Sequence, residues 1–361
     1  MLIYLSAAGF NRNQIDRVER ILNENNLSCD DILHKDFIKN YKNSLSKSII
    51  RKLENNNFES FEKIAEYTCK NCINIVTYKE REYPFNLKSI LDYPKVLYIK
   101  GNITDEDKCA IAVVGSRKYT NYGENAARYF TEELTKLGVT IISGMAYGID
   151  SVAHRTCLGN NGRTIAVLGN GVDVIYPSRN KSLYEKIIEN GAVISEYPLG
   201  YPSFAQNFPL RNRIISGLSK GIVVIEGKKH SGTLITARIA AEQGREVFSV
   251  PGNIDSLYSE GTNLLIRDGA LPLLEIEDIL TAFPDLQIKK QNNADKENII
   301  KSLSVNEKII YDLILSGNKD INIICEMSNF DVSYTNSLLT ILEIKGLINC
   351  DNNKDFNIIK N

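Results

Sequence analysis

The sequence predicts an α/β protein whose centre is a doubly wound, mostly parallel sheet. Two observations predict this class. Short apolar, β-branched runs recur through the middle of the 361-residue chain, and stretches with helical periodicity separate them. Glycines follow these helical stretches at positions 138, 159, 191 and 244, where a helix end favours a left-handed residue. Such alternation gives parallel strands with right-handed crossovers, and sheets of this kind hold ligands at the carboxyl ends of their strands.

The stretch 111–117 is the one around which the sheet is organised. It reads Ile-Ala-Val-Val-Gly-Ser-Arg, a buried strand that stops at a glycine and enters a polar turn. Strands are predicted at 111–115, 139–143, 163–168, 192–195, 221–226 and 246–250. The helices between them are predicted at 122–137, 148–158, 180–190, 209–219 and 232–243.

The first 75 residues predict a small helical domain. Its apolar residues recur at helical spacing at Ile15, Val18, Ile21 and Leu22. A second amphipathic stretch covers 49–72, and strands at 73–77 and 96–101 lead into the sheet. This domain contains no glycine-rich loop or acid–base cluster, so its residues do not indicate a function.

The composition changes after the sheet domain, which we place at 76–285. Residues 286–302 are polar and charged, as is typical of a linker. The tail, 303–361, predicts three helices and a hairpin, at 305–315, 320–328, 332–345 and 347–359. This order is typical of a winged helix-turn-helix. Its third helix contains one lysine and no arginine, which favours contact with a protein over reading of duplex DNA.

Composition limits the partners and the location. The chain has 43 Lys and Arg against 44 Asp and Glu, a net charge of −1, so nucleic-acid binding would require a local basic patch. No apolar run approaches the roughly 20 residues that cross a bilayer. The N-terminus has no basic leader, so we expect a cytoplasmic protein without membrane contact.

Cysteine usage argues against a disulfide framework. The seven cysteines are scattered, which favours reduced thiols. Cys69 and Cys72 form one CxxC without a second pair at zinc-site spacing, so two ordinary thiols are the simpler interpretation and metal or redox use the alternative. We expect no metal and no cofactor.

Small, polar and basic residues follow almost every predicted strand. Gly-Ser-Arg-Lys follows the first strand, and Glu226 to Thr233 contains two lysines, a histidine and a serine. Because the carboxyl ends of parallel strands share one edge, these loops predict an electropositive trough for a ligand that carries phosphate. Arg117 supplies a fixed fork of donors that matches a phosphate.

Each motif in these loops also has a structural interpretation. Gly144 and Gly148 are compatible with close packing of strand and helix, and Asp150 with a helix cap. His154 fits a packed histidine better than a catalytic one. Arg211 and Arg213 stand at a helix start, where an ion pair is the alternative to phosphate binding.

Catalytic and nucleotide-binding signatures are incomplete. Gly169-Asn-Gly171 has Val174 where a dinucleotide fingerprint needs its third glycine, and no Walker loop is present. Gly217-Leu-Ser-Lys-Gly221 matches a nucleophile elbow in letters only, because it leads from a helix into a strand. Glu196 and Glu226 end strands without a nucleophile beside them. Binding is therefore favoured over turnover.

Taken together, the motifs resemble the DNA-processing protein A family, also called DprA or Smf, over about residues 73–273. The resemblance rests on Tyr83-Pro84 with Leu87 and Pro94, Val114 to Arg117, Ser143 to Asp150 with Ala153-His154, Leu168 to Asp173 with Tyr176-Pro177, Ser195-Glu196, Phe208 to Ile215, Ser231 to Thr233 with Ala237, and Val250 to Gly252. The helical N-terminus, of SAM or helix-hairpin-helix type, and the winged-helix-like C-terminus also fit this family.

The resemblance implies an extended Rossmann-like sheet that binds and protects single-stranded DNA. It also implies a homodimer that helps to load the RecA recombinase during natural transformation, and no enzymatic activity. The implied DNA-binding positions are Gly115, Ser116, Arg117, Lys181, Phe208, Arg211, Asn212, Arg213, Ser231, Gly232 and Thr233.

The residues agree with this implied function on physical grounds. Single-strand binding needs a basic groove along the backbone and flat rings for the bases. Arg117, Lys181, Arg211 and Arg213 would supply the groove, and Phe208, with Tyr147 or Tyr176, a ring to stack upon. The prediction requires Arg117, Lys181 and Arg213 to share one rim. A nucleotide hydrolase using Glu196 and Glu226, and a sequence-specific regulator acting through the tail, are the alternatives.

Overall fold

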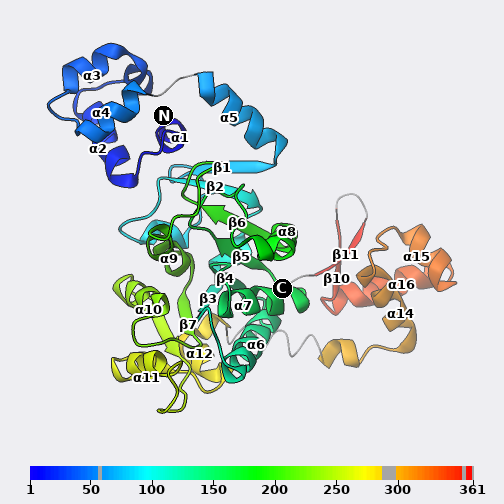
Figure 1. Cartoon of the computed structure of the whole chain (residues 1–361). Helices are drawn as coiled ribbons and strands as arrows, with labels where there is room; N and C mark the ends of the chain where they lie inside the picture. Colours follow the sequence, from blue (N-terminus) through cyan, green and yellow to red (C-terminus); the bar gives the residue numbers. More distant parts are fainter. Residues whose placement is uncertain (56–58, 287–297, 352–354, 360–361) are drawn as a thin grey trace. The chain divides into compact units, whose positions relative to one another are not determined.

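The computed structural model describes residues 1–55, 59–286, 298–351 and 355–359, and the chain forms two compact units. Unit 1 covers Met1–Ala282, and unit 2 covers Phe283–Asn361 (Figure 1). Within the described residues, no helix combines the length and the apolar character that a membrane crossing requires.

Unit 1 is built on a nine-stranded sheet in the order β1-β2-β6-β5-β4-β3-β7-β8-β9. Its strands are β1 (Ile73–Thr77), β2 (Val96–Gly101), β3 (Ala110–Val114), β4 (Thr140–Ser143), β5 (Thr164–Val167), β6 (Gly191–Ser195), β7 (Gly221–Val224), β8 (Glu246–Ser249) and β9 (Leu271–Pro272). From β6 to β9 all neighbouring strands are parallel, whereas β2 pairs antiparallel with both β1 and β6. The strand order reverses between β3 and β7, so their carboxyl ends form the topological switch point where such sheets bind ligands.

Helices cover both faces of this sheet (Figure 1). The first face carries α6 (Asn121–Lys136), α7 (Ile149–Gly159), α8 (Lys181–Glu189) and α12 (Ile276–Ala282). The opposite face carries α9 (Asn207–Leu218), α10 (Gly232–Glu242) and α11 (Glu260–Arg267). The strands β3 to β7 are buried along their whole length between these layers, which explains why they appear in the sequence as continuous apolar runs.

The predicted fold class is confirmed. Every strand and helix predicted between 73 and 250 is present, with ends displaced by at most two residues. The antiparallel pairing of β2 with β6, and the late elements α11, β9 and α12, were not predicted. β9 is two residues long and includes a proline, so it leaves almost no periodic signal in the sequence.

The N-terminal helices belong to the same compact unit as the sheet. They are α1 (Leu2–Ala7), α2 (Arg12–Glu24), the 3-10 helix η1 (Cys29–Leu33), α3 (Lys35–Tyr41), α4 (Lys47–Glu54) and α5 (Glu59–Lys70). Asn11 caps α2 through a capping box with Gln14. Their apolar faces share a core with Tyr98 of β2, whose hydroxyl donates to Ser6 Oγ at 3.1 Å.

Unit 2 has the predicted order of three helices and a hairpin. These are α14 (Val305–Leu315), α15 (Ile321–Ser328), α16 (Val332–Ile344), β10 (Ile348–Cys350) and β11 (Phe356–Ile358). Its core comprises Ile310, Ile314, Ile324, Leu338, Leu342 and Leu347. Most of the predicted linker, 287–297, lies outside the described residues.

Candidate nucleic-acid interface

A cavity of about 730 Å³ opens at the switch point, where the loops after β3 and β7 meet the start of α9. Nine of the eleven predicted site residues line this cavity, and Lys181 and Arg213 do not. Those nine are Gly115, Ser116, Arg117, Phe208, Arg211, Asn212, Ser231, Gly232 and Thr233.

The loop after β3 lies directly against the start of α7. A side chain at Gly115 would overlap Ile149, whose N–H donates to Ser116 O at 3.1 Å. Gly148 has φ +88°, and a side chain there would overlap the backbone of Ser116 and Arg117. Gly115 therefore leaves room for the Ile149 side chain, and Gly148 for the backbone of the loop, which is the packing interpretation of Gly148.

Glu226 anchors the far end of the same loop. Its buried carboxylate accepts hydrogen bonds from Thr120 N at 3.0 Å and from Thr120 Oγ1 at 2.5 Å. Thr120 Oγ1 in turn accepts from Gly123 N at 3.1 Å, as the N-cap of α6. Both carboxylate oxygens are used, so Glu226 is engaged in positioning the loop.

Arg211 forms the floor of the cavity and is only 3% exposed. Its Nη1 donates to Gly144 O at 2.9 Å and also to Val167 O. The buried carboxyl of Asp150 accepts from the backbone at Gly144 and Ala146; burial raises its pKa, and the charge of Arg211 opposes that rise. Burial likewise lowers the pKa of Arg211, to about 10. This guanidinium holds the loops after β4 and β5 together. The backbone N–H groups of Gly144 and Ala146, in the loop after β4, already donate to the Asp150 carboxyl.

Exposed cations stand around the rim of the cavity. Arg117, Lys118, Lys228 and Lys229 line it, with His230 beside them. None of the four cations has an ion-pair partner within the described part of the chain. Two acidic groups line the cavity, Asp150, which is buried, and Glu260, which is exposed, so the four exposed cations outnumber the one exposed carboxylate. The rim is therefore electropositive and its cations are available to an anion.

The start of α10 adds uncharged donors to this rim. Ser231 is the N-cap of α10, yet its side chain makes no capping hydrogen bond. Its Oγ is buried and has no hydrogen-bond partner among the described residues. The first N–H groups of a helix have no partner within the helix and carry a partial positive charge. A phosphate oxygen here would satisfy both the hydroxyl and these N–H groups.

An aromatic platform borders the cations. The Arg117 guanidinium lies 5.5 Å from the centroid of the Phe208 ring. Tyr176 packs on Phe208 with the two centroids 5.5 Å apart and the rings tilted by 34°. Tyr176, from the loop after β5, is exposed. The arrangement gives a base a ring to stack upon beside a cation that suits its phosphate.

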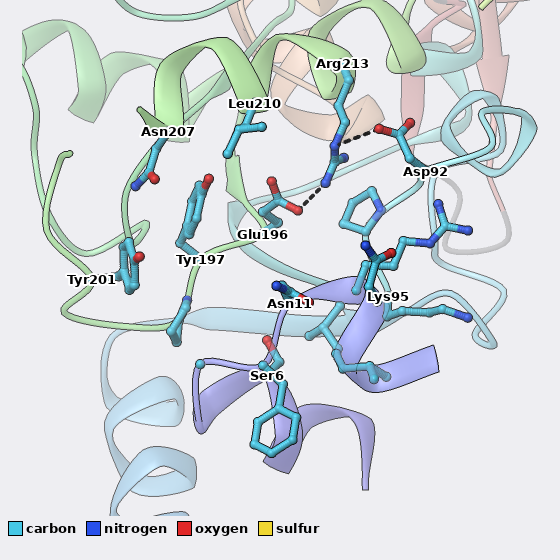
Figure 2. A pocket seen from close by; sticks show the side chains of 18 of the residues that line it. Ser6, Asn11, Asp92, Lys95, Glu196, Tyr197, Tyr201, Asn207, Leu210 and Arg213 are labelled. Atoms are coloured by element: carbon cyan, nitrogen blue, oxygen red, sulfur yellow. Dashed lines mark hydrogen bonds and ion pairs between the residues drawn. The ribbon is translucent and has the colours of Figure 1, made fainter. Parts of the chain in front are cut away.

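Arg213 lies in a different pocket. Its Nε is 3.2 Å from Asp92 Oδ2, its Nη2 pairs with Glu196, and its side chain is 14% exposed (Figure 2). Arg211 and Arg213 are two positions apart on a helix with 3.6 residues per turn, so their side chains diverge by roughly 200°. The ion-pair interpretation therefore describes Arg213, and Glu196 is its partner.

Lys181 also stands apart from the cavity. It begins α8, is 69% exposed and lies 4.0 Å from Glu185. Of the three cations expected to share one rim, only Arg117 lines the cavity. The positive charge there comes instead from Lys118, Lys228 and Lys229. These three lysines lie in the same loops as Arg117 and Ser231, which the sequence had already indicated as site residues. Their positive charge in those loops was therefore visible in the sequence.

His154 is a packed core residue. It is fully buried, and its Nδ1 lies 2.7 Å from Thr164 Oγ1. Burial lowers its pKa to about 3, so the ring is neutral at physiological pH. Across the described ranges, no group of three or more His, Cys, Asp and Glu side chains is arranged to hold a metal ion.

Comparison with known proteins gives one consistent result. The family model for DNA recombination-mediator protein A matches residues 74–284. Protein Smf of Escherichia coli is 51% identical over 199 residues, which cover 55% of this chain and 53% of that protein. DNA processing protein DprA of Bacillus subtilis is 42% identical over 218 residues, covering 60% and 73%. The chain thus spans about half the length of the E. coli relative.

Two solved structures are also similar. DNA processing protein A from Streptococcus pneumoniae aligns with a TM-score of 0.67 and 33% identity, covering 77% of this chain and 95% of that one. The protein from Helicobacter pylori, described with a single-stranded DNA binding mode, aligns with a TM-score of 0.53 and 28% identity, covering 59% and 96%.

Proposed function

The chain belongs to the DNA recombination-mediator protein A family, and from this premise we propose that it binds single-stranded DNA in the cavity between β3 and β7. One observation carries the proposal. Four cations without ion-pair partners in the described chain, Arg117, Lys118, Lys228 and Lys229, surround an α10 start whose Ser231 hydroxyl also has no partner there. This combination suits a phosphate backbone.

The bases of the strand are assigned to the Phe208–Tyr176 platform. Stacking on an aromatic side chain stabilises a bound base by about 1–3 kcal/mol and tolerates any sequence. The backbone contacts carry no sequence information either. The site therefore suits unpaired DNA of any sequence, because a duplex keeps its bases stacked upon one another.

We extend the proposal to the partners that the family implies. RecA is the proposed recombinase partner, and a second copy of this chain the proposed oligomeric partner, both in the cytoplasm. Exposed apolar side chains near the sheet edge, at Ile254, Leu257, Leu271 and Leu274, support a homodimer. Size-exclusion chromatography with light scattering tests this: a mass of one chain contradicts the dimer.

Binding without turnover is part of the proposal. Glu226 is engaged with Thr120 and Glu196 with Arg213, so neither carboxylate is placed to activate a water. The hydrolase alternative therefore has no observation in its favour. Incubation with nucleotides and DNA, followed by product analysis, should show no bond cleavage.

The experiment that tests the proposal is a titration by fluorescence anisotropy. We expect the chain to bind labelled oligo-dT more tightly than a duplex of equal length. Affinity should fall steeply as salt rises, because each phosphate contact releases counterions. Equal affinity for both DNAs, or an affinity independent of salt, would contradict the proposal.

A further inference from the structure

A second pocket, of about 520 Å³, lies at the same edge of unit 1, beyond β6 (Figure 2). Four parts of the chain form its walls: the loop after β6, the first turns of α9, the N-terminal helices α1, α2 and α4, and the segment that leads into β2, with Asp92 and Lys95. Figure 2 shows the α9 side chains along one wall, with Ser6 and Asn11 on the opposite wall. The proposed function of the first cavity does not use this pocket.

The first turns of α9 separate the two hollows. Phe208, Arg211 and Asn212 line the first cavity, whereas Leu210 and Arg213 line the second pocket. Because one helix divides them, a strand that stacks a base on Phe208 needs to cross only the start of α9 to reach the second pocket.

The second pocket has an aromatic wall of its own. Tyr197 and Tyr201 stack with centroids 4.9 Å apart and an interplanar angle of 20°. Phe204 meets Tyr201 edge-on at 5.8 Å and is 47% exposed. All three rings come from the loop after β6. Tyr197 and Tyr201 line the pocket and provide the flat apolar surface that an unstacked base requires.

The charges in this pocket are mostly paired, with two exceptions. Arg213 pairs with Glu196 and Asp92, but its Nη1 is buried and has no hydrogen-bond partner in the described chain. Lys52 donates to Gly9 O and to Gln14 Oε1 at 2.7 Å, and has no carboxylate partner among the described residues. One donor is thus left for a carbonyl on a base edge, and one cation for a phosphate.

We propose that the second pocket binds a further nucleotide of the same single strand. Its base stacks against the Tyr197–Tyr201 pair, a base carbonyl accepts from Arg213 Nη1, and its phosphate lies toward Lys52. This inference rests on the proposed function. It adds that the strand crosses α9 and that the N-terminal helices take part in DNA binding.

The test uses the full chain and oligo-dT of increasing length. For the wild type we expect affinity to rise in two steps, the second where the oligonucleotide becomes long enough to fill both hollows. Tyr201→Ala should weaken binding of the long oligonucleotides by roughly 5-fold or more and leave the short ones unchanged. Tyr201→Phe keeps the ring and should bind as wild type. Tyr129→Ala, which removes an exposed tyrosine on α6, is the matched control.

A second measurement does not depend on any variant. 2-Aminopurine placed at successive positions of a bound wild-type complex should be quenched in two separate zones, one for each aromatic wall. A single zone, or a Tyr201→Ala protein that folds and binds long oligonucleotides as wild type, overturns the inference. If Arg117→Ala still weakens every length in that case, the proposed function stands and only the second pocket fails.

Free deoxythymidine monophosphate distinguishes the source of the nucleotide. If it binds through Tyr201 while the second length step is absent, the pocket serves a free nucleotide and the strand assignment is overturned. If it competes only weakly and the length step is present, the strand assignment is supported.

Discussion

The switch-point cavity of unit 1 and helix α16 of unit 2 differ in what their cations contact. α16 is the third helix of unit 2, for which the sequence predicts the recognition-helix position, and the basic residue at its end, Lys345, pairs with Glu307 at 2.7 Å. At the cavity, Arg117, Lys118 and Lys228 line the rim without ion pairs in the described chain. Availability of charge, rather than the name of a motif, identifies the candidate DNA-binding surface.

The largest expected effect comes from removing two rim cations. Arg117→Ala with Lys228→Ala should cost about 3 kcal/mol of single-strand affinity, at about 1.5 kcal/mol for each charge-assisted contact, which is roughly 100-fold. Anisotropy titration at moderate salt measures this. Lys345→Ala, in unit 2, is the control and should leave the affinity for single-stranded DNA unchanged. If Lys345→Ala loses as much single-strand affinity as the double variant, the cavity is no more important for DNA binding than unit 2.

Substitutions of Glu226 test whether DNA binding requires the loop after β3 to be held in place, in addition to its positive charge. Glu226→Ala leaves the Thr120 donors unpaired, which should lower the free energy of unfolding by about 1–3 kcal/mol and weaken DNA binding. Glu226→Gln keeps an acceptor for Thr120 and removes a negative charge near the cavity, so DNA affinity should hold or rise. Urea unfolding and anisotropy on both variants measure this. A loss of affinity in Glu226→Gln equal to that in the alanine variant contradicts a positioning role.

Substitution of Ser231 should affect DNA binding without affecting the stability of the protein. Its hydroxyl has no partner in the described chain, so Ser231→Ala should not destabilise the protein. If the hydroxyl donates to a phosphate, affinity should fall by about 1 kcal/mol, or roughly 5-fold. Thr281→Ala, on α12, is the control, since Thr281 lines neither hollow and its Oγ1 donates within the helix, to Glu277 O at 2.9 Å. An unchanged affinity in Ser231→Ala would remove this hydroxyl from the site.

The smallest effect concerns unit 2 and pH. Hydrogen bonds from Lys345 and Ser304 lower the pKa of Glu307 below its ordinary 4.5. A lowered pKa in the folded state contributes stability above about pH 4.5, and that stability is lost as the pH falls through the lower folded value. The urea midpoint of unit 2 should therefore drop between pH 6 and 3, and less so in Glu307→Gln. Single-strand affinity at pH 6 should be the same in both proteins.

Much of the fold follows from local sequence. The buried run 110–114 and the helical stretches on either side of it follow from residue type and spacing alone, because each depends on neighbours a few positions away. The gathering of Gly115 to Arg117 with Ser231 to Thr233 at one edge follows as well, since parallel strands align their carboxyl ends. The antiparallel place of β2 does not follow, because it depends on a partner about 95 positions away, as in the pairing of Tyr98 with Ser195.

The sequence by itself determined which loops meet and which residue types they bring to the edge of the sheet. Only the tertiary structure decided which cations remain available there. Arg211 reaches the backbone of Gly144, and Arg213 reaches Glu196, whereas Arg117 remains exposed. The physical reason is that a charged side chain pairs with whichever group the folded chain places within a few ångströms, and residues distant in sequence supply those groups.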